Sequence, residues 1–159
     1  MKKTLFALLA VTAVLGAGLL AMGPFEAQAG PPKQPETIDL AAGEELYAEN
    51  CASCHGVNLE GQDNWRSPGP DGVLPAPPHD QTGHTWHHGD ALIFNYTKLG
   101  GKASLAEQGI EFNSGMPGFG EALSDQEIWN IVGFIKSTWP ERVQEVQSVC
   151  TESEQLRGK

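Results

Sequence analysis

The clearest hydrophobic pattern in this chain lies between Ser124 and Pro140, where apolar residues recur every three or four positions. The recurring residues are Ile128, Ile131, Val132 and Ile135. Such spacing places apolar side chains on one face of an α-helix. Ser124 followed three positions later by Glu127 is the capping-box pattern of a helix start, and Pro140 ends or bends the run. The sequence therefore predicts an amphipathic helix that begins after Ser124 and needs a packing partner.

Two further segments have helical composition. The stretch from Leu40 to Asn50 contains no proline, and a third helix is predicted from about Trp86 to Leu99, with Gly100-Gly101 ending it. Gly43 and Tyr47 are four positions apart, so they share one face of the first helix. A glycine there permits close approach of another helix. We expect the helix around Gly43 to cross the one that follows Ser124.

Directly after the first helix comes Cys51-Ala52-Ser53-Cys54-His55. Two thiols three apart and an adjacent imidazole are the attachment signature of c-type haem. Cys51 and Cys54 would form thioethers with the haem vinyl groups, and His55 would bind the iron. Zinc binding would need a second ligand pair, and thiol redox chemistry a βαβ setting. Neither pattern occurs in the sequence, so one covalent haem c is the expected cofactor.

Met116 is the expected sixth ligand of that iron. It lies in the loop Ser114-Gly115-Met116-Pro117-Gly118, just before the capped helix. If the chain is cleaved after Ala29, Met116 is its only remaining thioether. The alternative is that it fills a gap in the core, as methionine often does. A core methionine is seldom flanked by glycine and proline in a loop, which favours the ligand.

Residues 1–29 have the pattern of a secretory signal peptide: a basic start, an apolar run from Thr4 to Met22, and small residues up to Ala29. The run is long enough that an uncleaved membrane anchor stays open. Either way the predicted location is periplasmic, or the outer face of the cytoplasmic membrane. Cleavage would leave a net charge of −11, from eight basic and nineteen acidic residues. That charge disfavours nucleic-acid binding and predicts redox partners with a basic docking surface.

The order of these motifs resembles that of the class I monohaem cytochromes c, over roughly Ala42 to Trp139. The resemblance implies an all-α single domain of about three to five helices around one covalently bound haem, at residues 41–140. A Pro-rich linker (30–40) would precede it and a polar tail (141–159) would follow. The resemblance also implies electron transfer rather than enzymatic catalysis. In this family a proline carbonyl holds the proximal imidazole, and Pro77 is the best positional match, with Pro75 and Pro78 left open.

The stretch from Gly61 to Asp90 is longer than in the small members of that family, and we expect it to form a covering loop. Arg66 and Trp86 within it are candidate hydrogen-bond donors to the haem propionates. A solvated arginine and a packed tryptophan are the plain alternatives. The loop also contains four of the five histidines, which could form a copper or zinc site or replace Met116 in one state. These are His79, His84, His87 and His88.

Two alternatives to a simple electron carrier remain from the sequence. The chain could be a fixed cytochrome subunit of a dehydrogenase or oxidase complex, docked through the acidic segment after Pro140. It could instead be a haem sensor or peroxidase-like protein whose sixth site opens, with His79 or His84 on the distal side. Cys150 is the odd thiol and would either cross-link to a partner or have no role.

Overall fold

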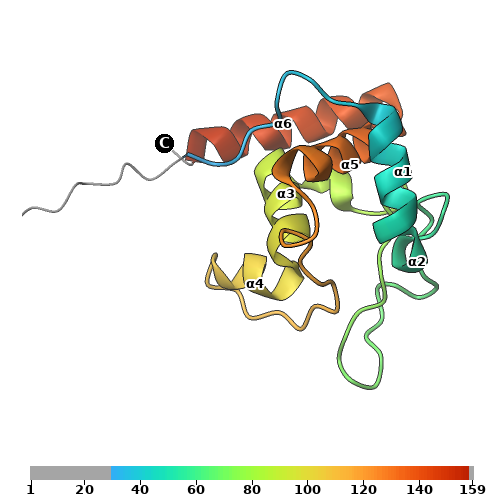
Figure 1. Ribbon diagram of the computed structural model, residues 1–159. Helices are drawn as coiled ribbons and strands as arrows, with labels where there is room; N and C mark the ends of the chain where they lie inside the picture. Colours follow the sequence, from blue (N-terminus) through green and yellow to red (C-terminus); the bar gives the residue numbers. More distant parts are fainter. Residues whose placement is uncertain (1–29, 158–159) are drawn as a thin grey trace, which may run out of the picture.

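The computed structural model describes residues 30–157, and the predicted signal peptide lies outside them. The described part is all-α, with six α-helices and one 3₁₀-helix and no strand (Figure 1). The elements are α1 (Leu40–Asn50), α2 (Ala52–His55), η1 (Thr85–His87), α3 (Asp90–Leu99), α4 (Gly101–Ala106), α5 (Asp125–Ser137) and α6 (Glu141–Arg157). Six α-helices are one more than the upper end of the expected range.

Helices α1 and α5 cross at Gly43, as the sequence predicts. A β-carbon on Gly43 would lie 2.6 Å from the carbonyl carbon of Asn130, so only a glycine permits this approach. Tyr47 is 2% exposed and packs against Phe134, with ring centroids 5.6 Å apart. One core cluster forms at this crossing, and its buried members include Tyr47, Ile131, Ile135 and Trp139.

The opposite face of α5 packs on α3. Phe94 of α3 stacks on Trp129 of α5, with centroids 4.4 Å apart, inside a second cluster that includes Ile93, Ile128 and Val132. Helix α5 therefore lies between α1 and α3 and buries apolar side chains on both sides. Its capping box is confirmed: the Ser124 hydroxyl accepts from the Glu127 amide, and the Ser124 amide donates to Glu127 at 2.8 Å.

The third helix begins later than the sequence indicates. Residues Thr85–His87 form η1, the chain is extended at His88 and Gly89, and α3 starts at Asp90. Hydrogen bonds from the far end of the chain cap α3 at this point, which local sequence does not reveal. At its other end α3 stops at Gly100 (φ +83°), as expected, but Gly101 already begins α4.

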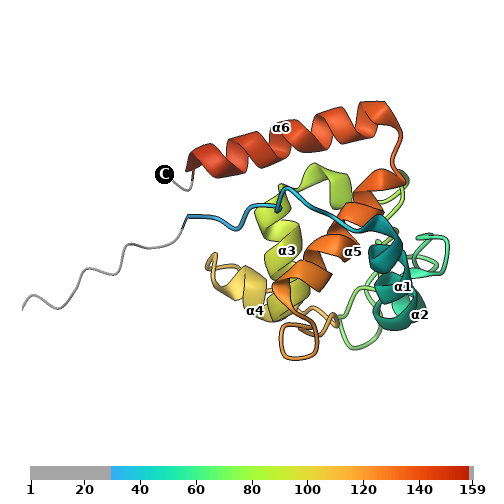
Figure 2. The same cartoon turned by 45° about the horizontal axis from the view of Figure 1, so that its top comes forward.

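Helix α6 is the extra helix, and it occupies the segment predicted as a polar tail. Its sequence has no apolar stripe, and several of the contacts that hold it are polar. Gln147, 2% exposed, donates to Asp90 Oδ1 at 2.7 Å, and Glu154 accepts from the amides of Ala91 and Leu92 at 2.8 and 2.9 Å. Helix α6 is thus attached across the amino end of α3, on the side of the molecule away from the long loops (Figures 1 and 2).

The Pro-rich residues 30–39 follow an extended path past α5 and α6 (Figure 2). Side chains of both helices bind their backbone or side chains: Gln126 donates to Thr37, Lys136 to Gln34, and Gln155 to Pro32, at 2.9 to 3.3 Å. Among residues 30–157, no helix has the length and apolar character to cross a membrane.

Candidate haem site

The Cys-x-x-Cys-His motif folds as one helical turn, with α2 following directly on α1. The amide of His55 donates to the Cys51 carbonyl at 2.9 Å, and Gly56 (φ +81°) ends the turn. Cys51 and His55 are buried, whereas Cys54 is exposed, and neither cysteine is in a disulfide. The turn therefore holds both thiols and the imidazole close together on one short element, ready for covalent attachment of a haem.

A backbone carbonyl fixes the tautomer of His55. Nδ1 of His55 lies 2.8 Å from the Pro77 carbonyl oxygen, so the pairing involves Pro77 rather than Pro75 or Pro78. Because a carbonyl oxygen only accepts hydrogen bonds, Nδ1 must carry the proton. Nε2 then keeps its lone pair, which is the form of histidine that binds a metal.

The segment around Pro77 is itself held in place by the start of the covering loop. The Gly61 amide donates to the His55 carbonyl at 2.7 Å, and the Gln62 amide donates to the Ala76 carbonyl at 2.8 Å. The Gln62 side chain accepts from the Ala76 amide at 2.9 Å. A β-carbon on Gly61 would lie 2.6 Å from the Pro77 carbonyl carbon, so the two segments touch backbone to backbone.

Burial controls the protonation of this site. It lowers the pKa of His55, against the opposing effect of the Pro77 hydrogen bond, so the neutral imidazole is favoured. Burial, and secondarily Cys54, raises the pKa of Cys51 to about 11. Catalytic redox cysteines instead have a lowered pKa. Cys51 therefore lacks the lowered pKa of a redox-active thiol.

The loop of Met116 is fixed to the carboxyl end of α3. The Gly101 amide donates to the Met116 carbonyl at 3.2 Å, and the Met116 amide donates to the Ser114 hydroxyl at 3.2 Å. Gly100 and Gly118 permit this contact, since a β-carbon on Gly118 would lie 2.7 Å from the Leu99 backbone. Met116 is half-buried, and its loop and α2 lie on the same side of the molecule (Figure 1).

The covering loop connects these two regions. It leaves α2, and its tip reaches the loop before Met116: Asn113 donates to the Asp71 carbonyl at 3.1 Å, and Gly115 approaches Val73. The Cys-His turn, the first part of the covering loop (residues 61–76) and the Met116 loop therefore form one continuous side of the molecule, opposite α6 (Figure 1). The sequence predicts that a haem would bind on this side. The last part of the covering loop instead contacts α6, where Gln147 donates to the His88 carbonyl at 3.2 Å.

Arg66 and Trp86, the expected propionate donors, both have partners within the protein. The Arg66 guanidinium lies 4.0 Å from the centre of the Trp65 ring. The Trp86 indole donates to the Gln81 carbonyl at 3.3 Å, and its ring stacks on His87 at 3.7 Å. A role toward the propionates stays a prediction for both residues.

The four histidines of the covering loop are spread over different contacts. His84 stacks on Trp65 at 5.3 Å and meets His88 edge to face at 5.4 Å, while His87 stacks on Trp86. Across residues 30–157, no group of three or more His, Cys, Asp or Glu side chains is arranged to hold a metal ion.

The fourth, His79, was considered from the sequence for a second metal site and for the distal side, but its contact with His55 was not predicted. Its ring stacks on that of His55, with centroids 4.0 Å apart and planes 22° apart. It therefore lies beside the imidazole expected to bind the iron, on the proximal side, which conflicts with the proposed distal role. The signal in the sequence was its position two residues after Pro77.

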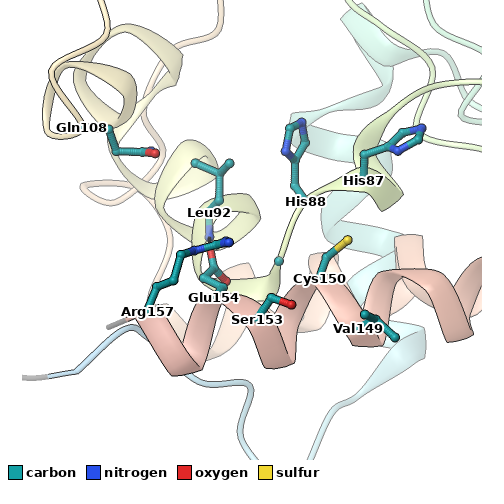
Figure 3. Close-up of a pocket in the computed structure, with 10 residues that line it drawn as sticks. His87, His88, Leu92, Gln108, Val149, Cys150, Ser153, Glu154 and Arg157 are labelled. Atoms are coloured by element: carbon teal, nitrogen blue, oxygen red, sulfur yellow. Dashed lines mark hydrogen bonds between the residues drawn. The ribbon is translucent and has the colours of Figure 1, made fainter. Parts of the chain in front are cut away.

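Cys150 lies away from this side of the molecule. It lines a cavity of about 360 Å³ between α3 and α6, together with His87, His88, Gln108 and Glu154 (Figure 3). Cys150 is half-buried and is not in a disulfide.

Three features together are those of a protein that binds a covalent haem: the all-α fold, the Cys-x-x-Cys-His turn and the hydrogen bond between His55 and Pro77. The family model described as cytochrome c matches residues 40–139, from the start of α1 to just beyond the end of α5, and leaves α6 outside. The chain belongs to the cytochrome c family. Its members carry electrons on covalently bound haem c, and Cys51 and Cys54 are the pair consistent with attachment here. Comparison with curated proteins and with solved structures finds no match.

Proposed function

We propose that this chain is an electron carrier whose haem c iron is ligated by His55 and Met116. The observation that carries the proposal is the hydrogen bond from His55 Nδ1 to the Pro77 carbonyl, because it leaves Nε2 free as a ligand. The cofactor supplies a one-electron couple between ferric and ferrous iron. The protein residues attach it, orient its proximal ligand and exclude water from that side.

Met116 supports the second half of this proposal. Its loop is anchored to the end of α3 by hydrogen bonds at Phe119 and Gly120 and to the start of α4 by one at Met116, so the thioether sits on a backbone fixed by hydrogen bonds. A methionine ligand raises the reduction potential of a haem relative to two imidazoles. With both axial positions filled, no site remains for a substrate, which supports electron transfer over peroxidase-like or sensory activity.

We further propose that the protein works in the periplasm or at the outer face of the cytoplasmic membrane, with redox partners that present basic surfaces. The signal-like residues 1–29 and the acidic composition support this assignment. Cytochrome c domains are typically periplasmic or extracellular, which agrees with it. The membrane-anchored alternative differs only in whether residues 1–29 are retained.

The test is the spectrum and midpoint potential of the purified holoprotein and of Met116→Ala. The wild type should be low-spin, with the weak near-infrared band that methionine ligation gives to ferric haem. Met116→Ala should lose that band and have a markedly lower potential, because no other described residue is a methionine. Glu121→Gln, an exposed change in the same connection, is the matched control and should keep both.

Two results would contradict the proposal. A Met116→Ala protein that kept the band and the potential would exclude Met116 as the ligand. A five-coordinate wild type that bound peroxide or a diatomic gas would favour the sensory or peroxidase-like alternative.

A further inference from the structure

The stacked pair His79 and His55 is the unusual feature of the proximal side. Their ring centres are 4.0 Å apart and their planes differ by 22°, so they overlap face to face. His55 therefore cannot rotate about its side-chain bonds without displacing His79.

The stack supplies a constraint that the Pro77 carbonyl does not. One hydrogen bond at Nδ1 fixes the direction in which the His55 ring points, at 2.8 Å from its acceptor. It still allows the ring to turn about the line between donor and acceptor. A second ring lying flat against the first removes that freedom, so the hydrogen bond and the stack together define the imidazole plane.

His79 is rigid enough to act as such a support. Its Nδ1 lies 2.8 Å from the Thr85 hydroxyl, and its carbonyl accepts from the Trp139 indole at 2.7 Å. Its amide donates to the Leu59 carbonyl at 2.8 Å, and its ring meets Tyr47 edge to face at 6.3 Å. Backbone and ring are thus held by four separate partners.

The electrostatics of the residue matter as well as its shape. An aliphatic side chain could fill this space, but the imidazole brings ring nitrogens and a dipole close to the proximal ligand. Ferric haem carries one more positive charge than ferrous haem, and a polar neighbour favours the more highly charged state.

We propose that His79 is a positioning residue for His55, which fixes the plane of the ligating imidazole and lowers the reduction potential of the haem. The inference rests on the proposed function, since it assumes that His55 binds the iron. It assigns to the covering loop a role in tuning the cofactor, through a residue that contacts the proposed ligand His55.

The experiment compares three variants of the holoprotein. His79→Leu removes the flat ring, His79→Phe keeps a flat ring without nitrogens, and His84→Leu removes a histidine of the same loop whose stacking partner is Trp65. The readouts are the hyperfine-shifted haem methyl resonances of the ferric protein, which depend on the orientation of the axial imidazole, and the midpoint potential.

We expect His79→Leu to change the methyl pattern and to raise the potential. His79→Phe should retain the methyl pattern and raise the potential, because stacking is kept and polarity is lost. His84→Leu should change neither. If His79→Leu retains the wild-type pattern, or if His79→Phe alters it as much as His79→Leu does, the positioning role is wrong. A potential that does not rise in either variant would refute the electrostatic role.

Thr85→Val keeps the inference testable if His79→Leu yields no holoprotein. It removes the partner of His79 Nδ1 and leaves the stacked ring, so a smaller change in the same methyl resonances is expected, and an unchanged pattern would contradict the inference. The two proposals also fail differently. A wild type without low-spin, histidine-ligated haem would overturn both proposals. A wild type with that haem, together with His79 variants whose methyl resonances and potential do not change, would overturn this inference alone.

Discussion

Three imidazoles of this protein, in His55, His84 and His88, have a lowered pKa, which favours their neutral form. Burial lowers the pKa of His55, His84 and His88, and nearby histidines add to the effect at His84 and His88. The unfolded chain can take up a proton on each of these rings at a higher pH than the folded chain can. Acid therefore favours the unfolded state through these residues.

The first prediction concerns His88, which lies away from the haem ligands. Since its folded pKa is below the ordinary value of 6.5, stability should be full above pH 6.5 and should fall as the pH drops below it. The midpoint of denaturant unfolding, measured from pH 8 to pH 5, should decline less steeply in His88→Gln than in the wild type. Equal slopes in the two proteins would show that His88 does not contribute.

At the scale of helices, one crossing organises the domain. Helix α5 is buried on both sides, by α1 at Gly43 and by α3 at Phe94. The crossing at Gly43 has no spare space, because the Asn130 carbonyl lies where a side chain would begin. It also places Tyr47, whose hydroxyl donates to the Gly56 carbonyl at 3.0 Å, so the contact of two helices helps to fix the end of the Cys-His turn.

The second prediction is that Gly43→Ala forces α1 and α5 apart. Overpacking of this kind costs about 1–3 kcal/mol, measured as a loss in the free energy of unfolding. Ala48→Ser, on the exposed face of α1, is the control and should change stability by less than about 0.5 kcal/mol. A fully stable Gly43→Ala protein would mean that the helices can separate without loss.

Across the whole molecule, α6 ties together segments that are distant in the chain. Asp90 accepts from Lys136 of α5 at 2.7 Å and from Gln147 of α6 at 2.7 Å. Glu154 caps the amino end of α3 from more than sixty residues away, where a carboxylate also meets the positive end of the helix dipole. The helix outside the family match thus completes the start of a helix inside it.

The third prediction tests this cap. Glu154→Ala leaves two amides of α3 without their acceptor and should reduce the free energy of unfolding by about 1 kcal/mol. Glu152→Ala, an exposed glutamate on the same helix, should have little effect. The haem spectrum should be the same in both variants, because α6 lies opposite the haem side. Equal stability of the two variants would argue against a capping role.

The fourth prediction concerns the net charge of the whole chain, −10 including the signal-like segment. Exposed acids such as Glu60, Asp63 and Glu121 lie in the segments around the candidate haem site. Electron transfer with a small cationic reagent should therefore slow as ionic strength rises from 0.01 M to 0.15 M, since the Debye length falls from about 30 Å to about 8 Å. With an anionic reagent it should accelerate. If the rate with the cationic reagent does not fall as salt is added, the acidic side chains must lie away from the haem edge.

Several local features of this protein could be predicted from its sequence. The capping box at Ser124 and Glu127, the crossing at Gly43 and the Cys-x-x-Cys-His turn each depend on residues a few positions apart, so their spacing carries the signal. The pairing of His55 with Pro77 spans 22 residues, and the family resemblance supplied it. Haem attachment and the all-α class followed from these patterns.

The tertiary structure alone decided three other features. Helix α6 is held through polar groups such as Gln147 and Glu154, so it shows no apolar periodicity. The start of α3 at Asp90 depends on caps from that distant helix. The stack of His79 on His55 arises because the covering loop returns to the proximal side. In each case the contact joins residues far apart in the chain, and a short-range pattern of residue types does not predict such a long-range contact.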